Sequence, residues 1–293
     1  MRDAVENVPV GRVLKVRRRD GGDVTGRLYR RRRDGGDIPL RPRTTGAQGA
    51  SRDLVAEFLA RRPFYVSHRL GGTEYPEFTQ AGLDASLRAG FKALEVSLRR
   101  CASGEYVMIH DWTTERVVPG TKLPIWSTPW DTLKTLRQAS GPFMRFTDLL
   151  EQIPDDVILA IDHKVTSSKQ DANSSDLQSE LDLYTLLDDA FNGHPERRVL
   201  WKHFVNAGSV DRAKARGYRI MCMMYPNELA TADTSRWDVL GLEWNAPAAA
   251  WQQITATGKP TIAHIITNAG QAQQALAKGA GGLMASWPTT VHP

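Results

Sequence analysis

The sequence contains little cysteine and no long apolar run. Its two cysteines, Cys101 and Cys222, lie far apart and outside any metal-binding or redox motif. We therefore expect neither a disulfide framework nor a zinc site. No stretch approaches the roughly 18 to 20 apolar residues that a membrane-spanning helix needs. The first residues also lack the apolar segment of a signal peptide, so we expect a cytoplasmic protein without a transmembrane segment.

Excess positive charge is absent outside the first fifty residues. Residues 1–50 hold 13 Lys and Arg against 6 Asp and Glu, whereas the remaining residues hold 25 against 27. Because nucleic-acid binding needs a basic surface, the body of the chain gives no reason to expect a nucleic-acid partner. A linker-like stretch follows at 44–51, so we expect an N-terminal arm over 1–50 and one domain over 51–293.

The basic arm contains a short repeat. The heptapeptide RRRDGGD occurs at 17–23 and again at 31–37, and Asp-Gly-Gly is typical of turns. The segment 24–29 between the two copies has the pattern of a short strand. A small β unit and a flexible tether both remain open, and so does a module that docks to another protein.

Beyond residue 63 the sequence alternates between apolar runs and helical patterns. The runs expected to form strands are 64–68, 93–98, 157–163, 198–203, 218–224, 239–243, 260–266 and 281–285. The helical patterns are 77–89, 174–191, 206–216, 246–257 and 268–278, and a short helix at 53–61 leads in. Eight alternating units predict an α/β fold, a closed (β/α)8 TIM barrel with a parallel sheet.

A ninth apolar run, 106–111, does not fit this alternation. About seven residues separate it from the second strand, and a parallel crossover needs about a dozen. We therefore expect an antiparallel return strand, with a turn near Ser103 and Gly104. That turn pairs Ser97 with His110, and alternation places Glu95 on the same face as Ser97.

The passage from 113 to 152 is long for a connection. Within it we expect one helix near 130–137 and another near 146–153. Passages of this length in compact domains are often lids or binding loops. A structural insertion that covers the end of the barrel is an equal alternative.

Residues that can carry charge or move protons stand at the predicted strand ends, where TIM barrels place their sites. They are His68, Arg69, Glu95, His110, Asp111, Asp162, Lys164, Lys202, His203, Glu243 and His264. By strand alternation His163 points away from Asp162, so we expect it to pack outward against helices. Carboxylates such as Glu95 and Asp162 suit a hard divalent cation, Mg2+ or Ca2+.

The other charged residues suit a phosphate. Arg69 can bind one as a planar fork and Lys164 as a point charge. His68 and His110 are suited to general acid and base catalysis near neutral pH. A cation site, a phosphate clamp and two histidines together predict cleavage of a phosphodiester.

The ordered motifs resemble those of the glycerophosphodiester phosphodiesterase family. Its members are (β/α)8 barrels with the motifs H-R-G, P-E-N-T, E-x-D, H-D and E-x-K. The matching segments here are His68-Arg69, Pro76-Glu77-Phe78-Thr79, Glu95-Val96-Ser97, His110-Asp111 and Asp162-His163-Lys164. The resemblance covers residues 63–290 and leaves out the arm.

The resemblance implies a role for each matching residue. His68 and His110 would be the acid and base, and Arg69 and Lys164 would hold the phosphate. Glu95, Ser97 and Asp162 would form the shell of a divalent cation, Mg2+ or Ca2+, supported by Glu77 and Asp111. The implied activity is metal-dependent hydrolysis of glycerophosphodiesters, either small molecules or a teichoic-acid-like polymer.

Four positions depart from the family pattern. Ser97 stands for the second acid of E-x-D, Asp162 for the glutamate of E-x-K, Leu70 for the glycine of H-R-G, and Phe78 for the asparagine of P-E-N-T. Three readings stay open for the cation: a weaker metal site, a shell completed by another acid such as Glu243 or Asp111, or binding without turnover.

Two further functions remain as alternatives. One is a phospholipase-type phosphodiesterase that acts on lipids. The other is a non-catalytic barrel that binds phosphodiester ligands within a surface assembly or a virion, anchored through its basic arm.

Overall fold

The structure is a computed structural model that describes residues 28–31, 37–40, 52–139, 141–164, 174–205 and 209–293. The chain divides into two compact units, Met1–Gln48 and Gly49–Pro293, and each is considered by itself. Within the described residues, no helix combines the length and the apolar character that crossing a bilayer requires.

The N-terminal unit contains two short strands. β1 (Leu28–Arg31) and β2 (Asp37–Leu40) pair antiparallel, with Leu28 opposite Leu40. The strand expected at 24–29 falls largely outside the described residues, and so do the linker at 44–51 and most of the arm. The tether and docking roles of the arm stay predictions.

The second unit is a closed barrel of eight parallel strands, so the predicted fold is confirmed. The strands are β3 (Phe64–Ser67), β4 (Ala93–Arg100), β8 (Ile158–His163), β9 (Val199–Phe204), β10 (Arg219–Met223), β11 (Val239–Glu243), β12 (Thr261–Ile266) and β13 (Gly282–Ala285). Pairing of β3 with both β13 and β4 closes the barrel. Each strand ends within two residues of its predicted bounds.

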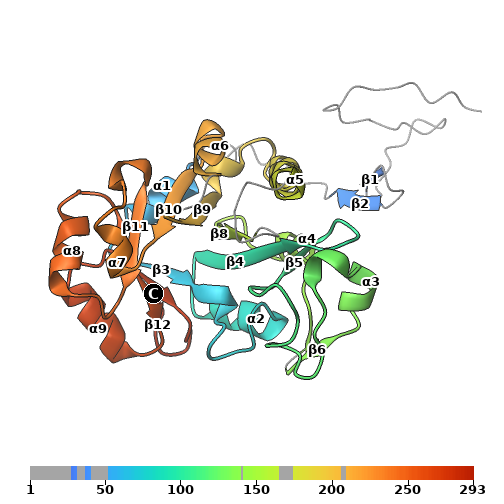
Figure 1. The fold of residues 1–293 in the computed structure, drawn as a ribbon, viewed down its shortest axis with the longest axis horizontal. Coiled ribbons are helices and arrows are strands. Elements are labelled where there is room, and N and C mark those ends of the chain that lie inside the picture. Colours follow the sequence, from blue (N-terminus) through green and yellow to red (C-terminus); the bar gives the residue numbers. More distant parts are fainter. Residues whose placement is uncertain (1–27, 32–36, 41–51, 140, 165–173, 206–208) are drawn as a thin grey trace, which may run out of the picture. The chain divides into compact units, whose positions relative to one another are not determined.

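Helices surround the strands on the outside (Figure 1). The crossover helices are α2 (Gln80–Arg88), α5 (Ser174–Ala190), α6 (Val210–Ala215), α8 (Ala248–Thr255) and α9 (Ala269–Ala277). A further short helix, α7 (Pro226–Leu229), was not expected from the sequence, and 3-10 turns occupy His68–Leu70, Ile125–Ser127, Pro195–Arg197 and Thr234–Arg236. Among the crossover helices, α2 and α9 begin with a side-chain cap, because Thr79 accepts from Gly82 N–H and Asn268 accepts from Gln271 N–H.

The barrel interior is apolar at one end and polar at the other. Alternate strand residues such as Val66 and Ala160 form a buried cluster, and residues of α1 (Leu54–Leu59), including Phe58, join it. Helix α1 therefore covers the N-terminal end of the barrel. Toward the C-terminal ends of the same strands, most of the side chains that point into the barrel are polar or charged. The candidate functional groups therefore lie at the C-terminal end of the barrel.

The return strand is present, with a register one residue away from the prediction. β5 (Tyr106–Met108) pairs antiparallel with β4, and Leu98 lies opposite Met108. Ile109 N–H accordingly donates to the Ser97 carbonyl, so the predicted pairing of Ser97 with His110 was wrong. Beyond these strands Cys101 N–H donates to the Glu105 carbonyl, so the loop itself has three residues, 102–104, and Gly104 adopts a φ of 93°. A loop of this length shifts the register by one residue.

The passage after the return strand folds around a small core of its own. It contains α3 (Trp130–Leu133), the paired strands β6 (Arg137–Gln138) and β7 (Gly141–Pro142), and α4 (Phe146–Leu150). The helix predicted to reach residue 137 ends at Leu133, because β6 begins four residues later. Ile125 and Phe143 are buried in this core, which favours the structural insertion over a lid.

Candidate active site

The candidate site is built on four strands that are neighbours in the barrel, β3, β4, β8 and β9. Register places Ser97 beside Asp162, and Ile161 beside Trp201. Lys202 therefore lies one step beyond this last pair, next to Asp162. Parallel strands thus bring together residues that are far apart in the sequence.

Glu95 is fully buried, and both of its carboxylate oxygens have partners. Lys202 Nζ donates to Oε1 at 2.8 Å, and the backbone N–H of Arg69 donates to Oε2 at 2.8 Å. The residue therefore ties the turn that follows β3 to the floor of the site.

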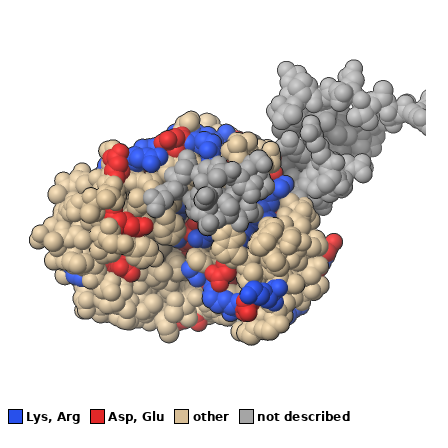
Figure 2. All heavy atoms as spheres, viewed as in Figure 1, with Lys and Arg blue, Asp and Glu red and all other residues tan. Residues whose placement is uncertain are grey.

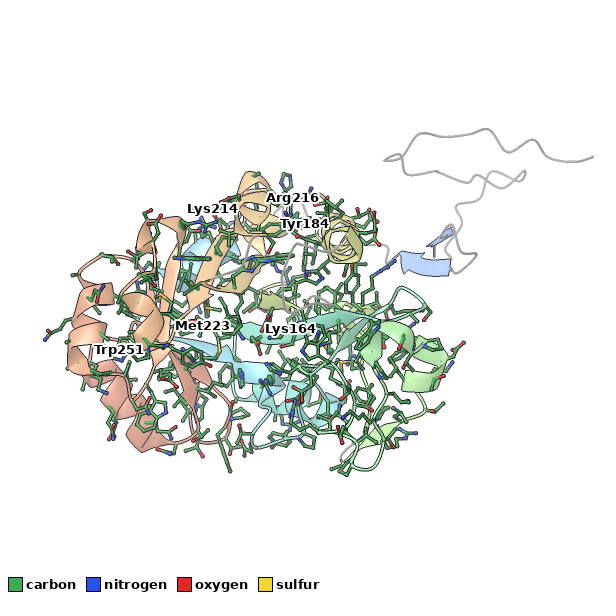
Figure 3. All side chains as sticks on the ribbon, in the orientation of Figure 1. Lys164, Tyr184, Lys214, Arg216, Met223 and Trp251 are labelled. Atoms are coloured by element: carbon green, nitrogen blue, oxygen red, sulfur yellow. The ribbon has the colours of Figure 1, made fainter. Side chains whose placement is uncertain are left out.

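Asp162 is also buried, and two lysines flank it. Lys164 Nζ lies 2.8 Å from Oδ2, and Lys202 Nζ lies 3.2 Å from the same oxygen. Figure 3 shows Lys164 near the middle of the molecule, inside the ring of helices, whereas the labelled Lys214 and Arg216 lie toward its edge. The predicted phosphate-binding lysine is thus placed at the site.

His68 begins the turn after β3 and is almost completely buried. Its Nδ1 lies 2.6 Å from the Oγ of Ser286, which directly follows β13. The contact fixes the plane of the imidazole ring and leaves Nε2 as the nitrogen available to a substrate.

His110 stands at the edge of the site and is one third exposed. Its Nδ1 lies 2.7 Å from Asp111 Oδ1, and the other oxygen of Asp111 accepts from Arg116. Arg116 also lies 2.7 Å from Glu77, whose second oxygen pairs with Arg69 Nη1 at 2.9 Å. The four charged side chains, Asp111, Arg116, Glu77 and Arg69, form one alternating chain that supports His110. Acidic and basic groups also lie side by side on the face that Figure 2 draws.

Arg99 holds the loop that carries His110. Its guanidinium donates to the His110 carbonyl at 2.9 and 3.2 Å and lies 4.2 Å from the ring centre of Trp112. Trp112 is itself in edge contact with Trp126. These contacts fix the backbone on both sides of the histidine.

Two departures from the family motifs occur at backbone positions that disfavour ordinary side chains. Leu70 has a φ of 56° and Phe78 a φ of 56°, both in the left-handed region. Glycine and asparagine adopt this conformation readily, which gives a physical reason for the residues of the family pattern. Both Leu70 and Phe78 are fully buried here, so their packing offsets a cost of about 1–2 kcal/mol each.

The electrostatics of the two histidines differ. Burial holds the pKa of His68 well below its ordinary value, and repulsion from Lys202 and Arg69 lowers it further. Burial and the cations Lys164 and Arg69 also lower the pKa of His110, but the hydrogen bond that its Nδ1 donates to Asp111 opposes them. Of the two, only His110 therefore has a carboxylate partner for its protonated form.

Ion pairing and burial also shift the pKa values of Asp162, Lys202 and Lys164. The pKa of Asp162 lies well below its ordinary value because Lys164 and Lys202 outweigh the effect of burial. The pKa of Lys202 is raised, since Glu95 and Asp162 outweigh its burial. The pKa of Lys164 is lowered instead, mainly by burial. Repulsion from Lys202 lowers it further, and attraction to Asp162 only partly offsets these two effects.

The donor set does not fit the divalent cation expected from the sequence. Within the described residues, no three His, Cys, Asp or Glu side chains come together as a cation site. Glu95 and Asp162 are neutralised by lysines, and Ser97, which is fully buried, supplies only a neutral hydroxyl. Asp111 does not complete a shell, because it binds His110 and Arg116. The divalent cation stays a prediction.

Three other sequence-predicted histidines contact groups outside this cluster. His163 points outward as expected and contacts Ser179 of α5 at 3.0 Å. His203 lies against Ser209 and the Trp201 ring, and His264 approaches the Met224 carbonyl at 3.3 Å. Glu243, the last residue of β11, is half-buried.

The sequence predicted Lys202 as a charged residue at a strand end but gave no role for it. Two further contributors to the site, Ser286 and Arg116, were not predicted. Lys202 could have been identified from its pattern, because it is a charged residue at a position of an apolar strand that points into the barrel. No comparable signal marks Arg116, which comes from the long insertion.

Comparison with known proteins finds similarity to phosphodiesterases. The model of the "Glycerophosphoryl diester phosphodiesterase family" matches residues 68–212, which confirms the resemblance seen in the motifs. A protein of Mycobacterium tuberculosis named "Probable glycerophosphodiester phosphodiesterase 1" is 36% identical over 67 residues. That match spans 23% of this chain and 24% of the relative, about a quarter of each.

Solved structures share the fold at low sequence identity. A phosphodiesterase from Oleispira antarctica, solved with the product sn-glycerol-3-phosphate, has a TM-score of 0.62 and 18% identity over 78% of this chain and 94% of that one. A glycerophosphodiester phosphodiesterase from Thermotoga maritima has a TM-score of 0.59 and 14% identity over 78% and 96%. These similarities show the barrel fold.

Proposed function

Because this chain is similar to the glycerophosphodiester phosphodiesterase family over residues 68–212, we propose that it hydrolyses glycerophosphodiesters. The observation that carries the proposal is the pair His68 and His110, set among the cations Arg69 and Lys164 at one end of the barrel. The product complex of the Oleispira antarctica phosphodiesterase, which has the same fold, supports glycerol phosphate as the product.

The two histidines take different roles in this mechanism. His68 is buried among cations and stays neutral, so it serves as the general base that activates water or the neighbouring hydroxyl of the glycerol. His110 is paired with Asp111, which stabilises its imidazolium form. A bound phosphodiester offsets the positive charge of Lys164 and Arg69, so His110 can hold a proton and donate it to the leaving alcohol.

Arg69 and Lys164 bind the phosphate. Arg69 Nε is buried and makes no hydrogen bond to the described residues, which leaves it as a donor for a phosphoryl oxygen. Lys164 is held by Asp162 and adds positive charge, and charge that develops on the phosphoryl oxygens is stabilised most where donors are fixed in advance.

A phospholipase-type activity has one observation in its favour. Trp126 is 47% exposed and Trp112 is 36% exposed. Both line a small pocket that Lys164 also reaches, close to the proposed phosphate site. Exposed aromatic rings suit a lipid surface or an alkylammonium headgroup. Trp130 is half-buried and Phe143 is buried, so they add nothing to that surface.

Release of glycerol-3-phosphate from glycerophosphocholine tests the main proposal. We expect His68→Ala and His110→Ala each to lower kcat by about 10²- to 10⁴-fold, since each removes a proton-transfer group. Parallel reactions with phosphatidylcholine vesicles and with a glycerol-phosphate polymer separate the three substrate classes.

A matched histidine serves as the control. His163 lies one residue from Asp162 but points outward, so His163→Gln should change kcat no more than a few-fold. Turnover that survives in both site variants would rule out the two-histidine mechanism. Absence of turnover on all three substrates would favour a barrel that only binds its ligand.

A further inference from the structure

Lys202 occupies the position that a cation would take between the two buried carboxylates. Its Nζ lies 2.8 Å from Glu95 Oε1 and 3.2 Å from Asp162 Oδ2. The lysine side chain is 6% exposed, and those of Glu95 and Asp162 are 0% and 5% exposed. All three groups are therefore shielded from water and hold one another in place.

We propose that the Lys202 ammonium is the resident cation of this site and stands where a divalent metal ion was expected. The inference rests on the proposed function and refines it, because it makes hydrolysis independent of Mg2+ and Ca2+. Lys202 is a positioning residue in this scheme, since it acts through the groups that it holds.

The balance of charge supports this assignment. The acid set expected by resemblance has three carboxylates around a divalent ion, a net charge of −1. This chain has Ser97 in place of one acid, so Glu95 and Asp162 supply two negative charges and Lys202 one positive charge. The sum is again −1. Loss of one acid and replacement of the ion by an ammonium therefore compensate each other.

Lys202 also organises the groups that act on the substrate. It holds Glu95, and the other oxygen of Glu95 accepts the backbone N–H of Arg69. That contact fixes the turn between His68 and Leu70, where Arg69 has a φ of 47°. The ammonium thus orients both the proposed base and the arginine of the phosphate clamp.

A divalent ion could bind here only by displacing this ammonium. Moving a lysine out from between two buried carboxylates would leave the lysine without partners in the barrel, which is strongly unfavourable. The neighbouring Lys164 adds further repulsion, because its Nζ lies 2.8 Å from Asp162. Ser97 Oγ is buried and makes no hydrogen bond to any described group, so the serine does not compensate.

Metal binding is the first test. Isothermal titration of the wild-type protein with CaCl2 and with MnCl2 should give no binding heat, and EDTA should leave Tm unchanged. Turnover of glycerophosphocholine should be the same in EDTA and in MgCl2. Turnover that EDTA abolishes and MgCl2 restores would overturn the inference and leave the proposed function intact.

The converse variant should create a metal site. Ser97→Asp combined with Lys202→Ala supplies a third acid and removes the ammonium, so Ca2+ should bind and should raise Tm by roughly 10 °C over the value in EDTA. Ser97→Asp alone is the matched control, because it keeps Lys202 and should not bind Ca2+. Equal Ca2+ binding by the two variants would contradict the role of Lys202.

A double-mutant cycle guards against variants that do not fold. Lys202→Met should lower Tm by roughly 10 °C or more, because it leaves the buried Glu95 without its ion-pair partner, whereas Asp162 keeps Lys164. Adding Glu95→Gln should recover part of that loss. Additive losses would show that Lys202 and Glu95 are not coupled. These measurements need no turnover, so they test the inference even if the proposed function fails.

Discussion

His264 should make the protein sensitive to acid. The residue lies in β12 and is buried, and its Nε2 approaches the Met224 carbonyl at 3.3 Å. Burial is the main cause that lowers its pKa to about 4, and repulsion from Lys202 also lowers it. The hydrogen bond to the Met224 carbonyl raises the pKa but does not outweigh them. The variant His264→Gln tests this, because glutamine keeps a polar group of similar length but cannot be protonated in this pH range.

The size of the effect follows from the two pKa values. The histidine is neutral in both states at about pH 7.5, so it contributes nothing to the pH dependence there. As pH falls through about 6.5, the unfolded chain gains a proton that the folded chain does not, and stability is lost until the folded residue is protonated near pH 4. At pH 5 the loss amounts to about 2 kcal/mol.

Guanidinium chloride unfolding at pH 7.5 and at pH 5 measures this loss. The wild type should lose about 2 kcal/mol more stability between the two pH values than His264→Gln does. Because the comparison is a difference within each protein, a uniform destabilisation by the substitution does not affect it. His292→Gln, at an exposed position, is the control and should behave like the wild type. An equal loss in wild type and His264→Gln would refute the reasoning.

Two further predictions concern the core. Gly282→Ala should cost about 1–3 kcal/mol, because the added Cβ would lie 2.2 Å from the Phe64 ring; an unchanged Tm would contradict this. Cys101 and Cys222 should not react with Ellman's reagent at pH 8 in the native protein, since both are buried and burial raises the pKa of each thiol, that of Cys222 to about 12. Both should react in guanidinium chloride, and fast native labelling of either thiol would show that it is accessible.

The barrel could be predicted because its strands are buried on both faces. Such strands appear as continuous apolar runs, and β8 (Ile158–His163) and β11 (Val239–Glu243) are examples of this pattern. The helices between them follow from amphipathic periodicity. The very short pieces, such as β6 and α7, have too few residues to show any period, and they were missed.

The return strand shows the limit of local reasoning. Its direction follows from the length of the connection, but its register depends on the number of residues in the hairpin loop. A loop of three residues with Gly104 in the left-handed region moved Ser97 opposite Ile109. An error of one residue in the register of this strand does not change the fold, but it changes which side chains lie opposite each other.

Sequence pattern alone was enough to predict the barrel, the strand ends that carry reactive groups, and the resemblance to a phosphodiesterase. The pairing of Lys202 with Glu95 follows only from the tertiary structure, because the two residues are 107 residues apart and meet only when the parallel strands close into a barrel. The bond between them satisfies two charges that could not be buried singly. Sequence pattern predicts which way each side chain points, whereas the closed barrel determines which charges are paired.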